Sequence, residues 1–142
     1  MSLNLSGEVE NNFEPDDISS RLKINATKSR KRMQFPKVSI DAGIARTYWS
    51  YKIREKDCRD ISVPFEKIYE IFGNKVTIIN ELCRELELEA NFTVNIHVKC
   101  GNRPLSEIPK EIITFASSIN ASMGFDLYCY DEDNDFDLDV IN

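Results

Sequence analysis

Residues 91–100 alternate apolar and polar side chains without a break, and this pattern constrains the fold more than any other feature of the sequence. Alternation of this length is typical of a β-strand with one buried face and one solvent-facing face. We therefore expect a strand here whose apolar side contributes to a core. The apolar set is Phe92, Val94, Ile96, Val98 and Cys100, and His97 lies on the polar side.

A second alternating run lies near the C-terminus, where Met123, Phe125, Leu127 and Cys129 are separated by single residues. Helical patterns precede and follow the first run. We predict that the two alternating segments lie in one sheet and that their apolar sides face the same set of helices.

Shorter signals predict the remaining elements. Prolines at positions suited to the first turn of a helix open two of the helical segments. Gly73 and Asn74 interrupt a long helical pattern, which is either two helices or one helix bent at the glycine. The elements are a strand around Leu3 and Leu5, a helix from Pro15 to about Leu22, a strand from about Ala45 to Arg54, helical patterns at 65–72 and 76–87, and a helix opened by Pro109.

This order, β-α-β-α-α-β-α-β, predicts a single two-layer α+β domain over residues 1–130. Polar residues on one side of each strand favour one mainly antiparallel or mixed sheet, of about four strands, packed against helices. Residues 23–43 show neither a helical nor a strand period and are interpreted as a long loop. Residues 131–142 are interpreted as an acidic C-terminal tail.

The net charge of −6 is unevenly distributed along the chain. Residues 18–56 carry eleven Lys or Arg against two acids, whereas residues 131–139 carry six acids and no base. Such asymmetry can mark an interaction surface, or the two segments can neutralise one another in the fold. No apolar run is long enough to span a bilayer and no signal-peptide pattern opens the chain, so we expect a cytoplasmic protein without membrane contact.

The potential metal ligands are sparse and widely spaced. Cys58, Cys83, Cys100 and Cys129 form no C-x-x-C pair, which favours reduced, packed thiols over a disulfide framework or a zinc site. The acidic tail has carboxylates at alternate positions, as calcium loops do, but Phe136 and Asn142 replace the glycine and glutamate that such a loop needs. We therefore predict no metal site and no cofactor.

Three pieces of the chain, taken in order, resemble an uncharacterised bacterial family, domain of unknown function 4279. They are the opening segment 13–18 with its helix and the Thr27-Lys28 turn, the aromatic strand that holds Trp49, and the closing segment 108–112 whose helix leads to 125–128. The resemblance covers about residues 3–130. It departs from the family where Lys28 to Arg32 stand in place of a glycine soon after the turn. The resemblance implies the architecture and no reaction.

Two groups of residues are candidate sites. The basic run, with the aromatic residues downstream of it, is a candidate for binding nucleic acid or a phosphate ligand, although the acidity of the whole chain works against nucleic acid. The polar sides of the two alternating strands offer a second candidate, in which the single histidine acts as a general base. The first group is Lys28, Arg30, Lys31, Arg32, Trp49 and Tyr51, and the second is His97, Asp126 and Tyr128.

No phosphate-binding loop, dinucleotide fingerprint, nucleophile elbow or zinc-protease motif occurs in the sequence. The leading interpretation is therefore a non-enzymatic cytoplasmic module that binds another protein. By analogy with immunity proteins that neutralise basic toxins, an acidic chain of this size would fit a partner with a basic surface. The alternatives are binding of nucleic acid or a phosphate ligand through residues 28–32, and an unrecognised enzyme that uses His97. The oligomeric state stays open.

Overall fold

The computed structural model describes residues 1–56, 60–99, 101–103 and 107–130 of the chain. These residues form a five-stranded mixed sheet with the strand order β2-β3-β1-β4-β5. All neighbours are antiparallel except β4 and β5, which are parallel. The predicted α+β class is confirmed, with one strand more than expected. The strands are β1 Ser2–Gly7, β2 Lys28–Arg30, β3 Tyr48–Lys52, β4 Leu88–Lys99 and β5 Ser122–Tyr130.

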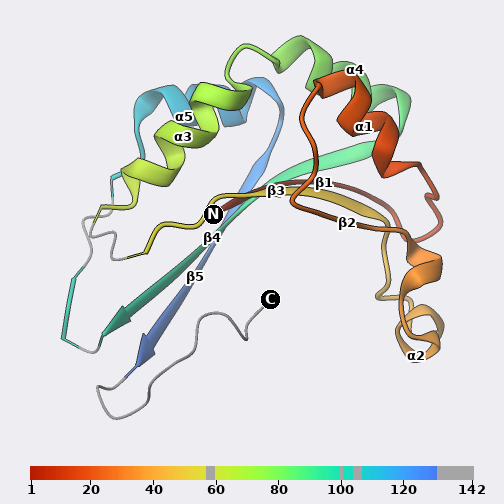
Figure 1. Ribbon diagram of the computed structural model, residues 1–142, viewed down its shortest axis with the longest axis horizontal. Coiled ribbons are helices and arrows are strands. Elements are labelled where there is room, and N and C mark those ends of the chain that lie inside the picture. Colours follow the sequence, from red (N-terminus) through yellow and green to blue (C-terminus); the bar gives the residue numbers. More distant parts are fainter. Residues whose placement is uncertain (57–59, 100, 104–106, 131–142) are drawn as a thin grey trace.

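Four helices lie together on one side of the sheet, which gives the domain its two layers (Figure 1). They are α1 Pro15–Leu22, α3 Ser62–Phe72, α4 Val76–Glu85 and α5 Lys110–Ser118. The short helix α2, Lys37–Asp41, lies beyond the layer, at the end of the molecule near β2. A single 3₁₀ turn, η1 Arg32–Gln34, precedes α2.

The core fills the space between the helical layer and the sheet. Trp49 from β3 is fully buried and meets the ring of Phe72 edge to face, with 6.2 Å between ring centroids. Phe92 from β4 makes the same kind of contact with Phe115 of α5 at 6.1 Å. Such aromatic pairs contribute beyond the area that they bury, so β3 and β4 are each fixed to a helix by a ring.

The first and last helices begin where their prolines predict. Pro15 is the first residue of α1, Asp16 and Asp17 lie in its first turn, and Lys23, with φ of 57°, ends it in the left-handed conformation. Acidic residues in the first turn stabilise the partial positive charge of a helix N-terminus. Pro109 is the N-cap residue of α5.

Gly73 separates α3 from α4, so the long helical pattern is two helices rather than one bent helix. A Cβ atom at position 73 would lie 2.6 Å from the carbonyl oxygen of Tyr69. Real side chains do not tolerate that distance, so only glycine permits this close turn.

The interpretation of residues 23–43 as one long loop is wrong, because this segment contains β2, η1 and α2. β2 consists of three exposed residues, which explains why no alternation revealed it. It forms because Lys28 and Arg30 pair with Ser50 and Tyr48 of β3, a contact between segments about 20 residues apart in sequence.

The two alternating runs do lie side by side, since Val94 pairs with Phe125 and Ile96 with Leu127. The prediction that helices cover both apolar sides holds only in part: Val94 is 2 % exposed, whereas Phe125 is 46 % and Leu127 61 % exposed.

The thiols differ from the expected packed state. Cys83 is half-buried, and burial raises its pKa, but Cys129 is exposed, so the prediction that it is packed is wrong. Cys58, Cys100 and the acidic tail lie outside the described residues.

Candidate functional site

The face of the sheet opposite the helical layer carries polar side chains that tie three strands together. The side-chain amide of Asn4, at the centre of β1, donates to Asn91 Oδ1 at 2.8 Å and to Thr93 Oγ1 at 3.2 Å, both on β4. On the other side, the hydroxyl of Ser50 on β3 donates to Asn4 Oδ1 at 2.6 Å. Because its polar groups bond to one another across the strands, this open face is held in a defined shape.

The open face is hollowed at the end where β3, β1 and β4 run side by side. The hollow has a volume of about 660 Å³. Its lining holds three cationic side chains and several hydroxyl and amide groups, and none of the lining residues is acidic. They are Met1, Ser2, Thr27, Lys28, Ser50, Lys52, Arg54, Thr93 and Asn95.

Thr27 fixes the geometry of this hollow. Its hydroxyl donates to the carbonyl of Ser50 at 3.1 Å and accepts the backbone N–H of Lys52 at 2.8 Å. The threonine thereby locks the start of β2 to β3. As a result, Lys28 of β2 and Lys52 of β3 line the same hollow.

The cations in the hollow repel one another. The pKa of Lys52 is lowered by burial first and then by the positive charges of Arg54 and Lys28. Burial and the charge of Lys52 also lower the pKa of His97, further along the same face. Three cationic side chains thus gather around this hollow, and such grouping makes the local potential more positive.

The structure divides the predicted basic group between different environments. Lys31 forms an ion pair with Glu14, and Arg32 forms one with Glu10 at 3.1 Å. The two side chains therefore fix the loop that precedes α1 to the segment after β2. Only Lys28 among the four bases lines the hollow.

Arg30 lies over the ring of Phe35, with its guanidinium carbon 4.7 Å from the ring centroid. Trp49 and Tyr51 lie on the helix-covered side of β3, where Tyr51 contacts Phe72 edge to face at 5.3 Å. The two aromatic residues therefore face the helical layer, on the side opposite Lys28.

The second predicted group lies together on the open face of the β4–β5 pair. The rings of His97 and Tyr128 stack with centroids 4.8 Å apart and planes inclined by 11°. Asp126 lies two residues before Tyr128 on the same face, opposite Asn95 of β4. Within the described ranges, no three His, Cys, Asp or Glu side chains gather so as to hold a metal ion.

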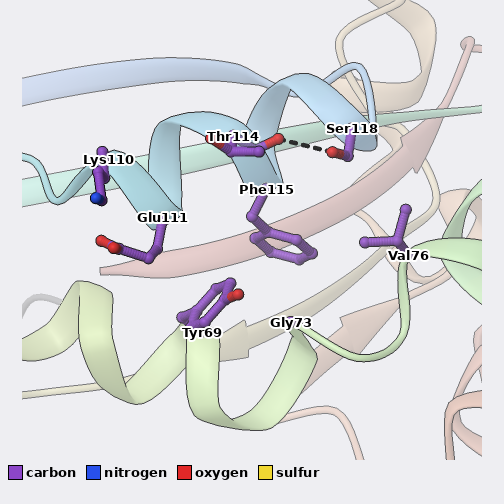
Figure 2. Close-up of a pocket in the computed structure, with 8 residues that line it drawn as sticks. All are labelled: Tyr69, Gly73, Val76, Lys110, Glu111, Thr114, Phe115 and Ser118. Carbon is purple, nitrogen blue, oxygen red and sulfur yellow. Dashed lines mark hydrogen bonds between the residues drawn. The ribbon is translucent and has the colours of Figure 1, made fainter.

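A smaller hollow, of about 260 Å³, lies between α3 and α5 on the helical side (Figure 2). Tyr69 and Phe115 meet edge to face there, at 6.1 Å. The hydroxyl of Ser118 donates to the carbonyl of Thr114 in its own helix, at 2.7 Å. The lining combines aromatic rings with one base and one acid, Lys110 and Glu111, and the Ser118 hydroxyl is already bonded within its own helix.

Sequence reasoning missed Thr27, Ser50, Lys52 and Arg54 as site residues. The signal was present in part, because Ser50, Lys52 and Arg54 occupy the polar side of the strand predicted from residue 45 to residue 54. The sequence did not indicate that β2 would place Lys28 beside these three residues.

Comparison with known proteins identifies a family for this chain. In the part of the chain that the structure describes, no helix is both long and apolar enough to cross a membrane. No curated protein and no solved structure matches the chain significantly. The model of one family, domain of unknown function (DUF4279), matches residues 1–130, which include all five described strands. The chain therefore belongs to this family.

Proposed function

We propose that this domain is a non-enzymatic binding module that holds an acidic segment of a partner protein on the open face of its sheet. The observation that carries the proposal is the gathering of Lys28, Lys52 and Arg54 around one hollow whose lining contains no carboxylate. Positive charges grouped in a concave surface attract and orient an anionic partner.

The distribution of charge favours an acidic rather than a basic partner for this face. The six acids of residues 131–139 equal the whole net charge of −6, so residues 1–130 carry equal numbers of acids and bases. The sequence-based expectation of a basic partner depended on the overall acidity, which resides in a segment outside the described residues. That expectation stays a prediction, as does the cytoplasmic location.

An acidic protein segment suits the hollow better than a nucleic acid does. Proteins that bind single strands combine a basic groove with exposed aromatic rings on which bases stack. Trp49 and Tyr51, two of the three rings predicted for that role, pack on the opposite side of β3, and the third, Tyr48, contacts the ring of Phe35 edge to face. Hydroxyls and amides such as Ser2, Thr93 and Asn95 can bond the backbone of an extended peptide.

The proposal is tested by fluorescence anisotropy with two labelled probes of similar charge, a hexaglutamate peptide and a hexathymidylate oligonucleotide. Titrations at about 50 and about 500 mM salt measure the electrostatic part of binding, because the Debye length falls several-fold in that range. The test variant is Lys28→Gln with Arg54→Gln. The matched control is Lys75→Gln with Lys110→Gln, which removes the same charge from the helical side.

We expect the peptide to bind at low salt, and the test variant to bind it about three- to tenfold more weakly, because two surface ion pairs contribute about 0.3–0.7 kcal/mol each. The control should bind as the unaltered protein does. Binding of the oligonucleotide but not the peptide would overturn the choice of partner. Equal weakening by the test and control variants would overturn the site.

A further inference from the structure

One row of side chains crosses the hollow from β3 to β4. Lys52 of β3 pairs with Ser2 of β1, and Ser2 pairs in turn with Thr93 of β4. All three residues line the hollow. Side chains that lie directly opposite each other on antiparallel strands have their Cβ atoms about 4.5–5.5 Å apart. An ammonium group and two hydroxyl groups, each able to donate a hydrogen bond, are therefore neighbours across this row.

Lys28 brings a second ammonium group to the β3 side of the hollow. It pairs with Ser50, which lies two residues before Lys52 on the same face of β3. Diagonal neighbours of this kind are about 7–8 Å apart, a distance across which two long lysine side chains can converge. After burial, the charges of Arg54 and Lys28 are what lower the pKa of Lys52, so the three cations act on one another.

The acid on the opposite side of the hollow lies well away from these lysines. Asp126 of β5 pairs with Asn95 of β4, and three strand spacings of about 4.8 Å separate β5 from β3. Glu55, next in sequence to Arg54, forms an ion pair with Lys67 of α3. The β3 side of the hollow is therefore the side on which a compact anion is bound most favourably.

On the basis of the function proposed above, we propose that the acidic segment held on this face carries a phosphorylated serine or threonine. Its phosphate group lies over Ser2, between the ammonium groups of Lys28 and Lys52. A phosphate on a side chain combines up to about two negative charges with three acceptor oxygens, whereas a carboxylate has one charge and two oxygens. Two ammonium groups beside a hydroxyl match the phosphate in both charge and number of donors.

The β4 side of the hollow favours a short phosphorylated side chain. Thr93 and Asn95 line that side and can bond the backbone of the segment. Ser2 lies one strand spacing, about 4.8 Å, from Thr93. The side chain of phosphoserine or phosphothreonine can cross that distance, whereas the longer side chain of phosphotyrosine would carry its phosphate beyond Ser2.

The test measures the binding of two labelled probes to the full chain by fluorescence anisotropy at pH 8. One probe is hexaglutamate, and the other is a pentapeptide in which one phosphoserine lies between two pairs of glutamates. Because the second pKa of the phosphate is about 6, both probes carry about six negative side-chain charges at this pH. The salt concentration is about 50 mM, at which screening is weak.

The test variants are Lys28→Gln and Lys52→Gln, made separately, and the matched control is Lys110→Gln on the helical side. We expect the phosphopeptide to bind the unaltered protein about tenfold or more tightly than hexaglutamate does, because it accepts additional charge-assisted hydrogen bonds. Each test variant should reduce that preference about threefold or more, and the control should keep it. Lys28 is exposed, so Lys28→Gln provides the test even where Lys52→Gln destabilises the fold.

The outcomes separate the phosphate from the acidic segment. A phosphopeptide that binds no more tightly than hexaglutamate would overturn the phosphate and leave the proposed function intact, whereas binding of neither probe would overturn both. A preference that Lys28→Gln leaves unchanged would overturn the assigned site.

Two unlabelled competitors identify the source of the phosphate. Inorganic phosphate that displaces the phosphopeptide at the same concentration as unlabelled phosphopeptide does would show that the ligand is the free ion, and the proposal would be wrong. Hexathymidylate that displaces it more readily than the unlabelled phosphopeptide does would show that the partner is a nucleic acid, with the same consequence.

Discussion

The hydrogen bond between Trp49 and Ser19 should stabilise the whole domain by a measurable amount. The indole N–H of Trp49 donates to Ser19 Oγ at 2.9 Å, and the tryptophan side chain is fully buried. The bond joins β3 to α1. It therefore holds the strand whose opposite side carries Ser50 and Lys52 of the hollow.

Replacing Ser19 by alanine removes the acceptor and leaves a buried donor without that partner. Such a loss costs about 1–3 kcal/mol. Alanine is a better helix former than serine by about 0.5 kcal/mol, which offsets part of the cost. The net expectation is a loss of about 0.5–2.5 kcal/mol. Ser20 is the matched control, since it is exposed and next along the same helix. Ser20→Ala should leave stability unchanged or raise it by up to about 0.5 kcal/mol.

Urea unfolding followed by tryptophan fluorescence measures the difference directly, because Trp49 is the only tryptophan in the chain. The midpoint should fall for Ser19→Ala with an unchanged slope, as expected when stability rather than the extent of unfolding changes. Equal midpoints for the two alanine variants would refute the reasoning, since the hydrogen bond would then contribute nothing.

Three further predictions concern stability. Asn4→Ala removes the amide that links β1 to both neighbours and should cost about 1–3 kcal/mol in urea unfolding. The pKa of His97 is lowered by burial and by Lys52, so the unfolded chain binds the proton more tightly, and stability should rise as pH increases to about 6.5. His97→Gln should reduce that rise in urea midpoints between pH 5 and 7.5 without abolishing it, because burial also lowers the pKa of the N-terminal amine of Met1 to about 6 and this amine adds a rise that continues towards pH 8. Gly73→Ala should cost about 1–3 kcal/mol, because its Cβ would meet Tyr69 O, with thermal unfolding as the measurement.

The elements with local signals were predictable from the sequence. The helix from Pro15 to Leu22 has the bounds expected from its proline, its acidic first turn and the spacing of Ile18 and Leu22. The helix that Pro109 was expected to open is present, and it buries Ile112 and Phe115, which lie three residues apart on one face. These signals act within a few residues, so a single sequence contains them in full.

β2 could not be predicted because nothing within its three residues favours a strand. Lys28, Ser29 and Arg30 are all exposed, and a basic run with no apolar member is typical of a loop. Its conformation comes from pairing with β3 and from the bond between the backbone N–H of Thr27 and the carbonyl of Ser50, at 2.9 Å.

The candidate site could not be predicted from the sequence for a related reason. Alternation indicated the polar side of each strand, but the hollow depends on which strands are neighbours in the sheet. β1, the first strand in the sequence, lies at the centre and joins β3 to β4. Strand order is set by the packing of the whole chain, so Lys28, Lys52 and Thr93 meet through contacts that no local pattern encodes.

The exposure of Phe125 and Leu127 in the outer half of β5 is explained by the lengths of two successive elements. α5 has nine residues and spans about 14 Å at 1.5 Å per residue. β5, also of nine residues, spans about 30 Å. A helix that crosses over from β4 to β5 can therefore cover less than half of the strand that it precedes. The half-buried Met123 at the start of β5 and the exposed Leu127 further along agree with that limit.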